Sequence, residues 1–229
     1  MPRVPQSIVQ RALGDDFHRL HPQLQRQYGL TSGDKLACIG RGVMESVWRG
    51  RFHVVPFLRL GANRSVMFPE TGDDVPFTIE NYAYVDSFGR ETLTWTRTFE
   101  FSLPRRFDET LIYSQGRRCA VVYAGTHQHL AVDLRLSVDP DGAFRLRTHA
   151  QRLYEWRIPI PFPLLFSGVA DVRESFDESK GRFDVAVDIA NPVWGRIFGY
   201  KGWFTLEWRP CPPHAIPPDV RPVREEWRE

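Results

Sequence analysis

Apolar residues near the N-terminus recur every three or four positions. The set comprises Val9, Leu13, Phe17, Leu20 and Leu24. This spacing places them on one face of helical segments. Pro22 suits the first turn of a second short helix, and Gly29 suits its end. Residues 1–30 are therefore predicted to form a helical brace that packs on the rest of the chain.

From about Leu36 onward, apolar and polar residues alternate. The alternation is clearest over five runs, at residues 77–85, 92–101, 130–138, 183–189 and 198–208. A period of two is typical of β-strands that bury one face and expose the other to water. Two stretches break this pattern: residues 55–62 suit one turn of helix, and residues 61–74 suit a long loop.

Turn-forming residues join the alternating runs. Residues 87–89 and 139–142 suit tight hairpins, and residues 177–181 suit a slightly longer one. Parallel βαβ units are disfavoured because no helical segment separates the runs. The pattern predicts a mainly β fold of the α+β kind. In it, a curled antiparallel sheet or barrel over residues 31–209 encloses a pocket.

Residues 210–229 form a proline-rich tail. Six prolines lie between positions 210 and 222, and a proline cannot donate a backbone hydrogen bond. We expect this tail to run extended over the surface of the β domain, with Trp227 as its candidate anchor.

The composition is that of a soluble globular protein. The 229 residues are 42% hydrophobic and 25% charged, and 30 basic residues nearly balance 28 acidic ones. This balance argues against binding nucleic acid through a positive field. Cys38, Cys119 and Cys211 are odd in number and far apart. They predict neither a disulfide framework nor a zinc site.

No stretch of the sequence is suited to crossing a membrane. The N-terminal residues lack the apolar core of a signal peptide. The longest apolar stretch, residues 158–170, contains three prolines and is far shorter than the roughly 20 residues that span a bilayer. We therefore expect a cytoplasmic protein with no membrane span.

Several short groups of residues in the β domain carry a family resemblance. They are Asp74-Val75-Pro76, Trp95-x-Arg97-x-Phe99, Phe183-Asp184-Val185, Pro192, Gly195 and Tyr200-x-Gly202. These groups resemble an uncharacterised bacterial domain family of unknown function, and the likeness covers roughly residues 10–208. In that family the domain occurs alone or fused to NAD-binding modules similar to saccharopine dehydrogenase or short-chain reductases.

The resemblance implies work close to small-molecule metabolism, with a reductase as a candidate partner. It assigns no catalytic residue. The chain itself contains no Gly-x-Gly-x-x-Gly turn, so it carries no dinucleotide-binding module of its own. We predict that the protein uses no cofactor.

Three polar residues fall within apolar rows of the predicted strands. Arg97, Asn81 and Glu174 each have apolar neighbours two positions away on both sides. A charge that is removed from water is costly unless it is paired and hydrogen-bonded. We therefore expect a contact between Arg97 and Glu174, completed by Asn81 and Tyr200.

Two interpretations of this cluster remain open. In the first, a buried ion pair only fixes the register of the strands. In the second, the cluster lies in a pocket where Glu174 moves a proton and Arg97 binds an anionic or carbonyl oxygen. Charged groups in an apolar pocket are the usual first candidates for a functional site.

Aromatic residues are a further signal. Six tryptophans lie in the β domain, where they either pack the core or line a pocket for a polycyclic or acyl ligand. Stacking on nucleic-acid bases is disfavoured because no basic stripe accompanies the rings. The candidate ligand-binding residues are Asn81, Trp95, Tyr200, Trp156 and His53.

His127 and His129 are two positions apart, so in a strand both side chains point to one face. Such a pair can supply two ligands to zinc or iron. A third ligand has to come from far away, with His53 or His149 as candidates. The alternative is a turn exposed to solvent, and we predict no metal site.

These observations lead to three hypotheses of function. The first is a cofactor-independent isomerase, cyclase or lyase acting on a hydrophobic small molecule, with Glu174 as proton carrier and Arg97 as the clamp. The second is a non-catalytic module that binds a lipid-like or polycyclic ligand. The third is an accessory partner of a separately encoded reductase, which needs no pocket.

Overall fold

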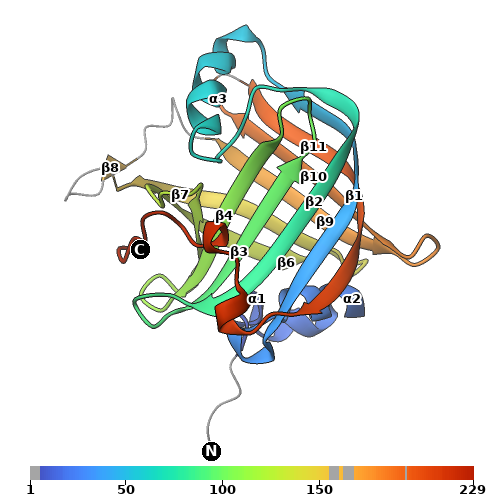
Figure 1. The fold of residues 1–229 in the computed structure, drawn as a ribbon, viewed down its shortest axis with the longest axis vertical. Helices are drawn as coiled ribbons and strands as arrows, with labels where there is room; N and C mark the ends of the chain where they lie inside the picture. The colour runs from blue at the N-terminus through green and yellow to red at the C-terminus, as the bar shows by residue number, and fades with distance from the viewer. Residues whose placement is uncertain (1–5, 155–159, 162–167, 194) are drawn as a thin grey trace, which may run out of the picture.

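The computed structural model describes residues 6–154, 160–161, 168–193 and 195–229. Within these residues, ten antiparallel strands close into a barrel, which confirms the predicted mainly β class (Figure 1). The strands of the barrel are β1 (Leu36–Arg49), β2 (Gly72–Val85), β3 (Glu91–Phe99), β4 (Arg105–Ser114), β5 (Cys119–Ala124), β6 (Leu130–Val138), β7 (Phe144–Leu153), β9 (Val169–Asp177), β10 (Arg182–Asn191) and β11 (Gly195–Pro210). A two-residue strand, β8 (Ile160–Pro161), pairs with the end of β7.

The strands follow one another around the barrel in chain order. Each strand of the circle pairs with the next one, and β1 pairs with β11 to close it, from Leu36 opposite Pro210 to Arg49 opposite Phe198. The three expected hairpins join β2 to β3, β6 to β7 and β9 to β10. Their glycines Gly89, Gly142 and Gly181 have φ angles of 77°, 80° and 61°, which is the left-handed region that favours glycine.

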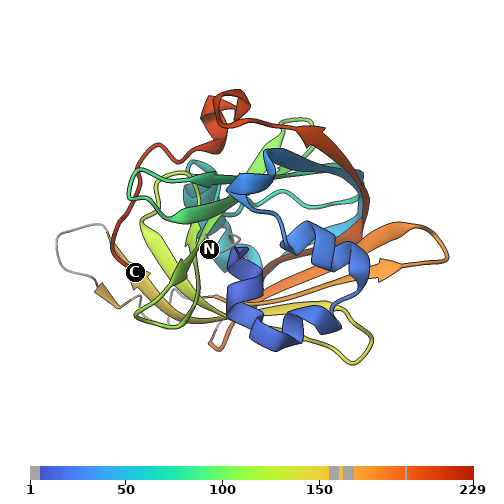
Figure 2. The ribbon, with the colours of Figure 1, turned by 90° about the horizontal axis from the view of Figure 1, so that it is seen from below.

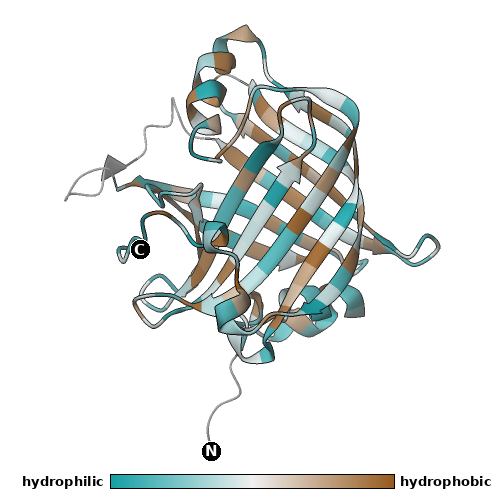
Figure 3. Cartoon of the chain, viewed as in Figure 1, coloured by the Kyte–Doolittle hydropathy of each residue, from teal (hydrophilic) through white to brown (hydrophobic). Residues whose placement is uncertain are grey.

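Alternation along the strands sends one row of side chains into the barrel. Figure 3 shows this as hydrophobic and hydrophilic bands that alternate along the strands. Aromatic rings dominate part of the interior: the ring centroid of Phe99 lies 5.0 Å from that of Phe77 and 5.1 Å from that of Tyr200. These are ordinary separations for packed aromatic pairs.

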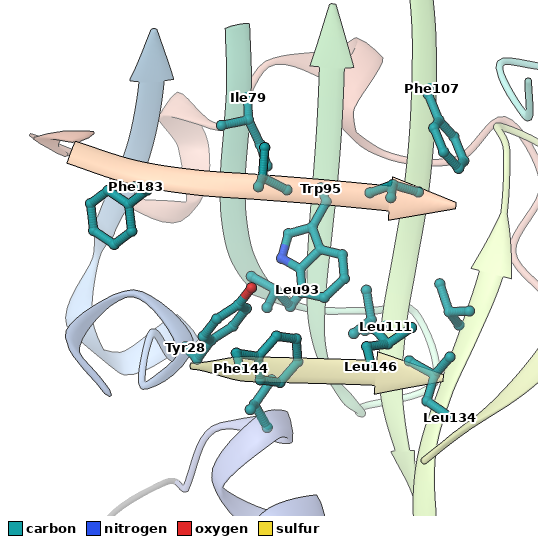
Figure 4. Close-up of a cluster of buried hydrophobic side chains, with 14 of the residues drawn as sticks. Tyr28, Ile79, Leu93, Trp95, Phe107, Leu111, Leu134, Phe144, Leu146 and Phe183 are labelled. Atoms are coloured by element: carbon teal, nitrogen blue, oxygen red, sulfur yellow. The ribbon is translucent and has the colours of Figure 1, made fainter. Parts of the chain in front are cut away.

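Two short helices close one end of the barrel (Figures 1 and 2). They are α1 (Ile8–Leu13) and α2 (Pro22–Tyr28), joined by the 3-10 turn η1 (Gly14–Arg19). The apolar residues predicted to share a face are all buried. The helical brace is confirmed, and it also plugs the barrel. Tyr28 points inward and packs on Phe144 with ring centroids 4.1 Å apart (Figure 4).

The opposite end carries the turn η3 (Phe52–Val54) and the helix α3 (Val55–Ala62) (Figure 1). The expected single turn is thus part of a helix of eight residues. On this helix, Leu58 is fully buried, whereas Phe57 and Leu60 are exposed. Among the described residues, no helix combines the length and apolar character needed to cross a bilayer.

The proline-rich tail packs on the outside of β1 and β2. It contains the short turns η4 (Pro213–Ala215) and η5 (Pro218–Val220), and its Cys211, Ile216 and Val220 form a buried cluster with Tyr82 and Tyr84 among others. A further turn, η2 (Ser32–Asp34), precedes β1.

Trp227 does not anchor the tail, because its side chain is 67% exposed. Glu226 does so instead. Only 1% of Glu226 is exposed, and its carboxylate binds Arg224 and Arg228. Its backbone N–H donates to Oε1 of Gln128 at 2.6 Å, across 98 residues of sequence. The backbone of Glu226 thus makes the contact with the barrel that we expected from the ring of Trp227, and the two arginines that pair with its carboxylate belong to the tail itself.

Candidate functional site

The barrel interior contains two adjoining spaces. A cavity of about 510 Å³ lies at the α3 end and is called the wide cavity here. A smaller space of about 50 Å³, the inner chamber, lies between it and the helical plug. The two share five residues of their walls: Phe107, Glu109, Thr148, Ala170 and Ile189. A ligand in the wide cavity therefore has the inner chamber directly below it.

Apolar side chains form most of the wall of the wide cavity. They come from α3 and from strands on several sides of the barrel, and include Phe57, Leu60, Met67, Val122, Leu130, Val132 and Leu153. Ligand pockets for small molecules commonly have volumes of about 300–1,000 Å³ and walls of this kind, with a few polar groups that fix orientation. The size and lining of the wide cavity fit a hydrophobic small molecule.

Arg97 on β3 is buried at the inner chamber, where its Nη1 lies 2.8 Å from Oε2 of Glu109 on β4. This corrects the expected pairing of Arg97 with Glu174. Trp95 and Glu109 are opposite each other in the β3–β4 register, so Arg97 reaches its partner diagonally across two strands. The negative charge of Glu109 therefore balances the positive charge of Arg97 in the inner chamber.

Glu109 was not recognised from the sequence. The β4 stretch around it reads Phe107-Asp108-Glu109-Thr110-Leu111, and three consecutive polar residues conceal the alternation. Phe107 and Leu111, two positions to either side of Glu109, are both buried, and Phe107 and Glu109 line both spaces. The spacing of Phe107 and Leu111 was the one signal that could have revealed Glu109.

Glu174 on β9 is the most unusual group of the inner chamber. It is 4% exposed, and its Oε1 has no hydrogen-bond partner among the described residues. Burial raises the pKa of its carboxyl from 4.5 to about 7, because Gln27, Tyr28 and Arg97 only partly offset the cost of removing the charge from water. Glu174 is therefore poised to exchange a proton near neutral pH.

Two tyrosine hydroxyls complete the polar part of the inner chamber. Tyr28 comes from the plug and Tyr200 from β11. Burial raises the pKa of Tyr200 to about 12 and that of Tyr28 well above its ordinary value. Both phenols stay protonated at neutral pH and can donate a hydrogen bond to an oxygen in the chamber.

The other predicted ligand-binding residues are dispersed. Trp95 lines the inner chamber, where its ring lies 5.3 Å from the guanidinium carbon of Arg97. Asn81 is buried in the wall between Cys38 of β1 and Trp95 of β3, outside the described linings of both spaces. His53 belongs to η3 and is likewise outside those linings. Trp156 lies outside the described residues.

His127 and His129 both line the wide cavity, so neither lies in a turn that only faces solvent. Their ring centroids are 5.7 Å apart. Nδ1 of His127 lies 2.9 Å from Oγ1 of Thr126, and Nδ1 of His129 lies 2.9 Å from Nη1 of Arg64. In the described part of the chain, no group of three or more metal-ligating side chains is present. The two histidines and Arg64 form a basic edge on a mostly apolar cavity.

The C-terminal tail holds the loop that carries these histidines. The backbone N–H of Val223 donates to the carbonyl oxygen of Thr126 at 2.7 Å, and Nη1 of Arg224 donates to that of His127 at 3.3 Å. Between the histidines, Gln128 has a φ of 52° and accepts from Glu226. A segment that seemed peripheral in the sequence therefore shapes the wall of the wide cavity.

Two comparisons with known proteins agree with the family resemblance. Residues 20–204 match the family model described as "Domain of unknown function (DUF4166)". The chain is also 33% identical to the "Uncharacterized protein YndH" of Bacillus subtilis (strain 168) over 195 residues, which cover 85% of this chain and 94% of that protein. This ten-stranded barrel with a plugged and a hollow end therefore belongs to the DUF4166 family.

Proposed function

We propose that this protein binds a hydrophobic small molecule in the wide cavity and catalyses a cofactor-independent proton transfer on it. Glu174 carries the proton, and the reaction is of the isomerase, cyclase or lyase type. The observation that carries the proposal is the buried carboxyl of Glu174, whose Oε1 has no hydrogen-bond partner among the described residues and whose pKa is raised to about 7.

The dimensions of the two spaces suggest how a ligand is placed. An apolar body of drug-like size fits the wide cavity of about 510 Å³. The inner chamber of about 50 Å³ has room for about three to five water-sized groups, since one water needs roughly 10–15 Å³ of such space. A carbonyl group that projects from the apolar body suits this chamber.

The chemistry proceeds in two balanced steps. The carboxylate of Glu174 takes a proton from the carbon next to the carbonyl, and the electron pair of that C–H bond moves toward the carbonyl oxygen. Arg97 and the hydroxyl of Tyr200 stabilise the charge on that oxygen. In a substrate whose acidic carbon also adjoins a C=C bond, Glu174, now protonated, returns the proton to the far carbon of that double bond. The C=C bond moves into conjugation with the re-formed carbonyl, and the net reaction is an isomerisation.

A non-catalytic binding module is the alternative. The Arg97–Glu109 pair favours it, because a guanidinium that is already paired at 2.8 Å has fewer donors left for a substrate oxygen. In this alternative the polar groups of the inner chamber only hold the strands in register, and the ligand is stored or presented unchanged.

Native mass spectrometry of the freshly purified protein tests the first part of the proposal. The expected result is a co-purified hydrophobic molecule that is lost from a Val132→Trp variant, in which the indole occupies part of the wide cavity. A folded protein that neither co-purifies with a ligand nor binds the apolar dye N-phenyl-1-naphthylamine contradicts binding, and it favours the accessory role beside a reductase.

Deuterium exchange tests the second part. The extracted ligand is incubated in D₂O with the wild type, with Glu174→Gln, and with Glu45→Gln as a control on the exposed surface of β1. We expect the wild type and the control to incorporate deuterium on carbon, and Glu174→Gln to be slower by at least about 100-fold. Equal incorporation in all three removes Glu174 from the mechanism, and ligand retention without incorporation favours the binding module.

A further inference from the structure

Large apolar side chains protrude from the α3 end of the barrel. Phe52 is 80% exposed, Phe57 56% and Leu60 68%. These three residues, together with the arginines of the same segment, are called the rim patch here. Phe57 and Leu60 also line the wide cavity, so the rim patch borders the place where a ligand enters.

The segment that carries the rim patch contains positively charged side chains and no negatively charged ones. Residues 46–69 contain Arg49, Arg51, Arg59 and Arg64 but no aspartate or glutamate, and all four arginines are exposed. The acidic residues that flank the segment face other arginines: Glu70 binds Arg105 at 2.5 Å, and Glu45 lies 3.9 Å from Arg182. The positive charge around the exposed rings is therefore not offset within its own segment.

The position of α3 presents these side chains outward. Val54 and Leu58 are buried beneath η3 and α3 with exposed fractions of 5% and 0%. This fixes the helix on the barrel and leaves Phe52, Phe57 and Leu60 largely exposed, with Phe57 and Leu60 at the mouth of the wide cavity. A contiguous exposed apolar surface on a soluble protein usually marks an interaction site. Phenylalanine and leucine on one side with arginines around them are typical of helices that lie in a membrane interface.

We propose that the rim patch docks the barrel on an anionic lipid surface, with the mouth of the wide cavity turned toward the lipid. The apolar side chains enter the boundary between headgroups and acyl chains, and the four arginines bind the anionic headgroups. The contact is peripheral, since among the described residues no helix can cross a bilayer. The inference goes beyond the proposed catalysis and does not depend on Glu174.

Vesicle flotation with the purified full chain tests this proposal directly. Vesicles of phosphatidylcholine alone are compared with vesicles that contain about one-third phosphatidylglycerol, at low and at high salt. We expect binding to the anionic vesicles only, with strong weakening in 0.5 M NaCl, because salt screens the attraction between arginines and headgroups.

Two variants and two matched controls locate the contact. Phe52→Ser changes the most exposed ring, which is outside the described lining of the wide cavity, and is expected to lower partitioning about tenfold. Arg51→Glu with Arg59→Glu is expected to lower it at least about 25-fold, at about fivefold for each arginine lost. Phe88→Ser in the β2–β3 hairpin at the plugged end and Arg135→Glu on β6 are expected to leave it unchanged.

Three outcomes overturn the proposal. The first is no binding to anionic vesicles by the folded wild type. The second is binding that the rim variants and the controls weaken equally, which means that another face makes the contact. The third is a dimer in sedimentation equilibrium that Phe52→Ser dissociates, which assigns the rim patch to a second copy of this chain. None of these outcomes bears on deuterium exchange, so the two proposals fail separately.

Discussion

The two ends of the barrel are built from the same strands but differ in how well their apolar side chains are covered. At the plugged end, Leu24 of α2 is fully buried and Tyr28 fills the space beside Phe144. At the α3 end, Leu60 is 68% exposed and a cavity of about 510 Å³ remains. The first end contributes apolar burial to folding, whereas the second leaves apolar surface uncovered. The plugged end therefore contributes more to stability, and the open space at the α3 end is what the proposed ligand binding requires.

Truncating one leucine at each end is the sharpest test of this comparison. Leu24→Ala opens a cavity in a packed region, and we expect it to lower the free energy of unfolding by about 2–5 kcal/mol. Leu60→Ala removes an exposed side chain, and the expected change is within about 0.5 kcal/mol. Urea denaturation of both variants measures the difference. Equal losses contradict the division, because they mean that α3 is as tightly packed as the plug.

The inner chamber lies where the two ends meet, and its Glu174 makes stability depend on pH. The pKa of this carboxyl rises from 4.5 to about 7 on folding because the group is buried. Between these values the folded protein keeps a proton that the unfolded chain releases. The free energy of unfolding therefore falls as the pH rises from about 4.5 through about 7, by up to about 3 kcal/mol.

Glu174→Gln removes this penalty. We expect the variant to be more stable than the wild type at pH 8 and to lose most of the pH dependence between pH 4.5 and 7. Denaturation curves across this range give the result, with Glu45→Gln as the exposed control. If the wild type and Glu174→Gln change in parallel with pH, folding does not raise the pKa of this carboxyl, and the observation that carries the proposed function is lost.

The sequence predicted the strands better than it predicted their partners. Alternation over residues 77–85 and 183–189 is a local property, so the β class and the hairpins followed from it. Closure of the barrel depends on β1 meeting β11, and this contact between distant segments has no local signature. Glu174 and Arg97 were recognised as buried because both interrupt apolar rows, which is again local information.

Acidic residues whose neighbours in the sequence do not suggest burial were missed. Arg97 pairs with Glu109, which stands among polar neighbours, and Glu226 in the tail was overlooked in favour of Trp227. A sequence-based prediction places a carboxylate of a proline-rich tail in solvent. In the structure, Arg224 and Arg228 pair with this carboxylate and help to cover it. The burial of Glu226 also depends on how the tail packs on the barrel, where its backbone N–H meets Gln128.

The last comparison concerns one part of the α3 end, the loop that carries His127 and His129. The C-terminal tail holds this loop in place. Burial opposes the charge on Glu226, but hydrogen bonds from Arg228 and Arg224 outweigh it and lower the pKa of this carboxyl to about 2. The stabilisation is therefore present above about pH 4.5 and is lost as the pH falls through about 2. Glu226→Gln weakens these bonds at neutral pH, and we expect a loss of about 1–2 kcal/mol.

The more specific expectation for Glu226→Gln is local. The backbone N–H of Glu226 and that of Val223 fix Gln128 and Thr126 at 2.6 and 2.7 Å, so weakening the anchor lets residues 125–129 open more often. Hydrogen exchange in this loop is expected to speed up while the strands of the plugged end keep their protection. The neighbouring Glu225→Gln, whose carboxylate binds Ser87 instead, is the control. If both variants leave exchange in the loop unchanged, the tail only covers the barrel and does not shape the wall of the wide cavity.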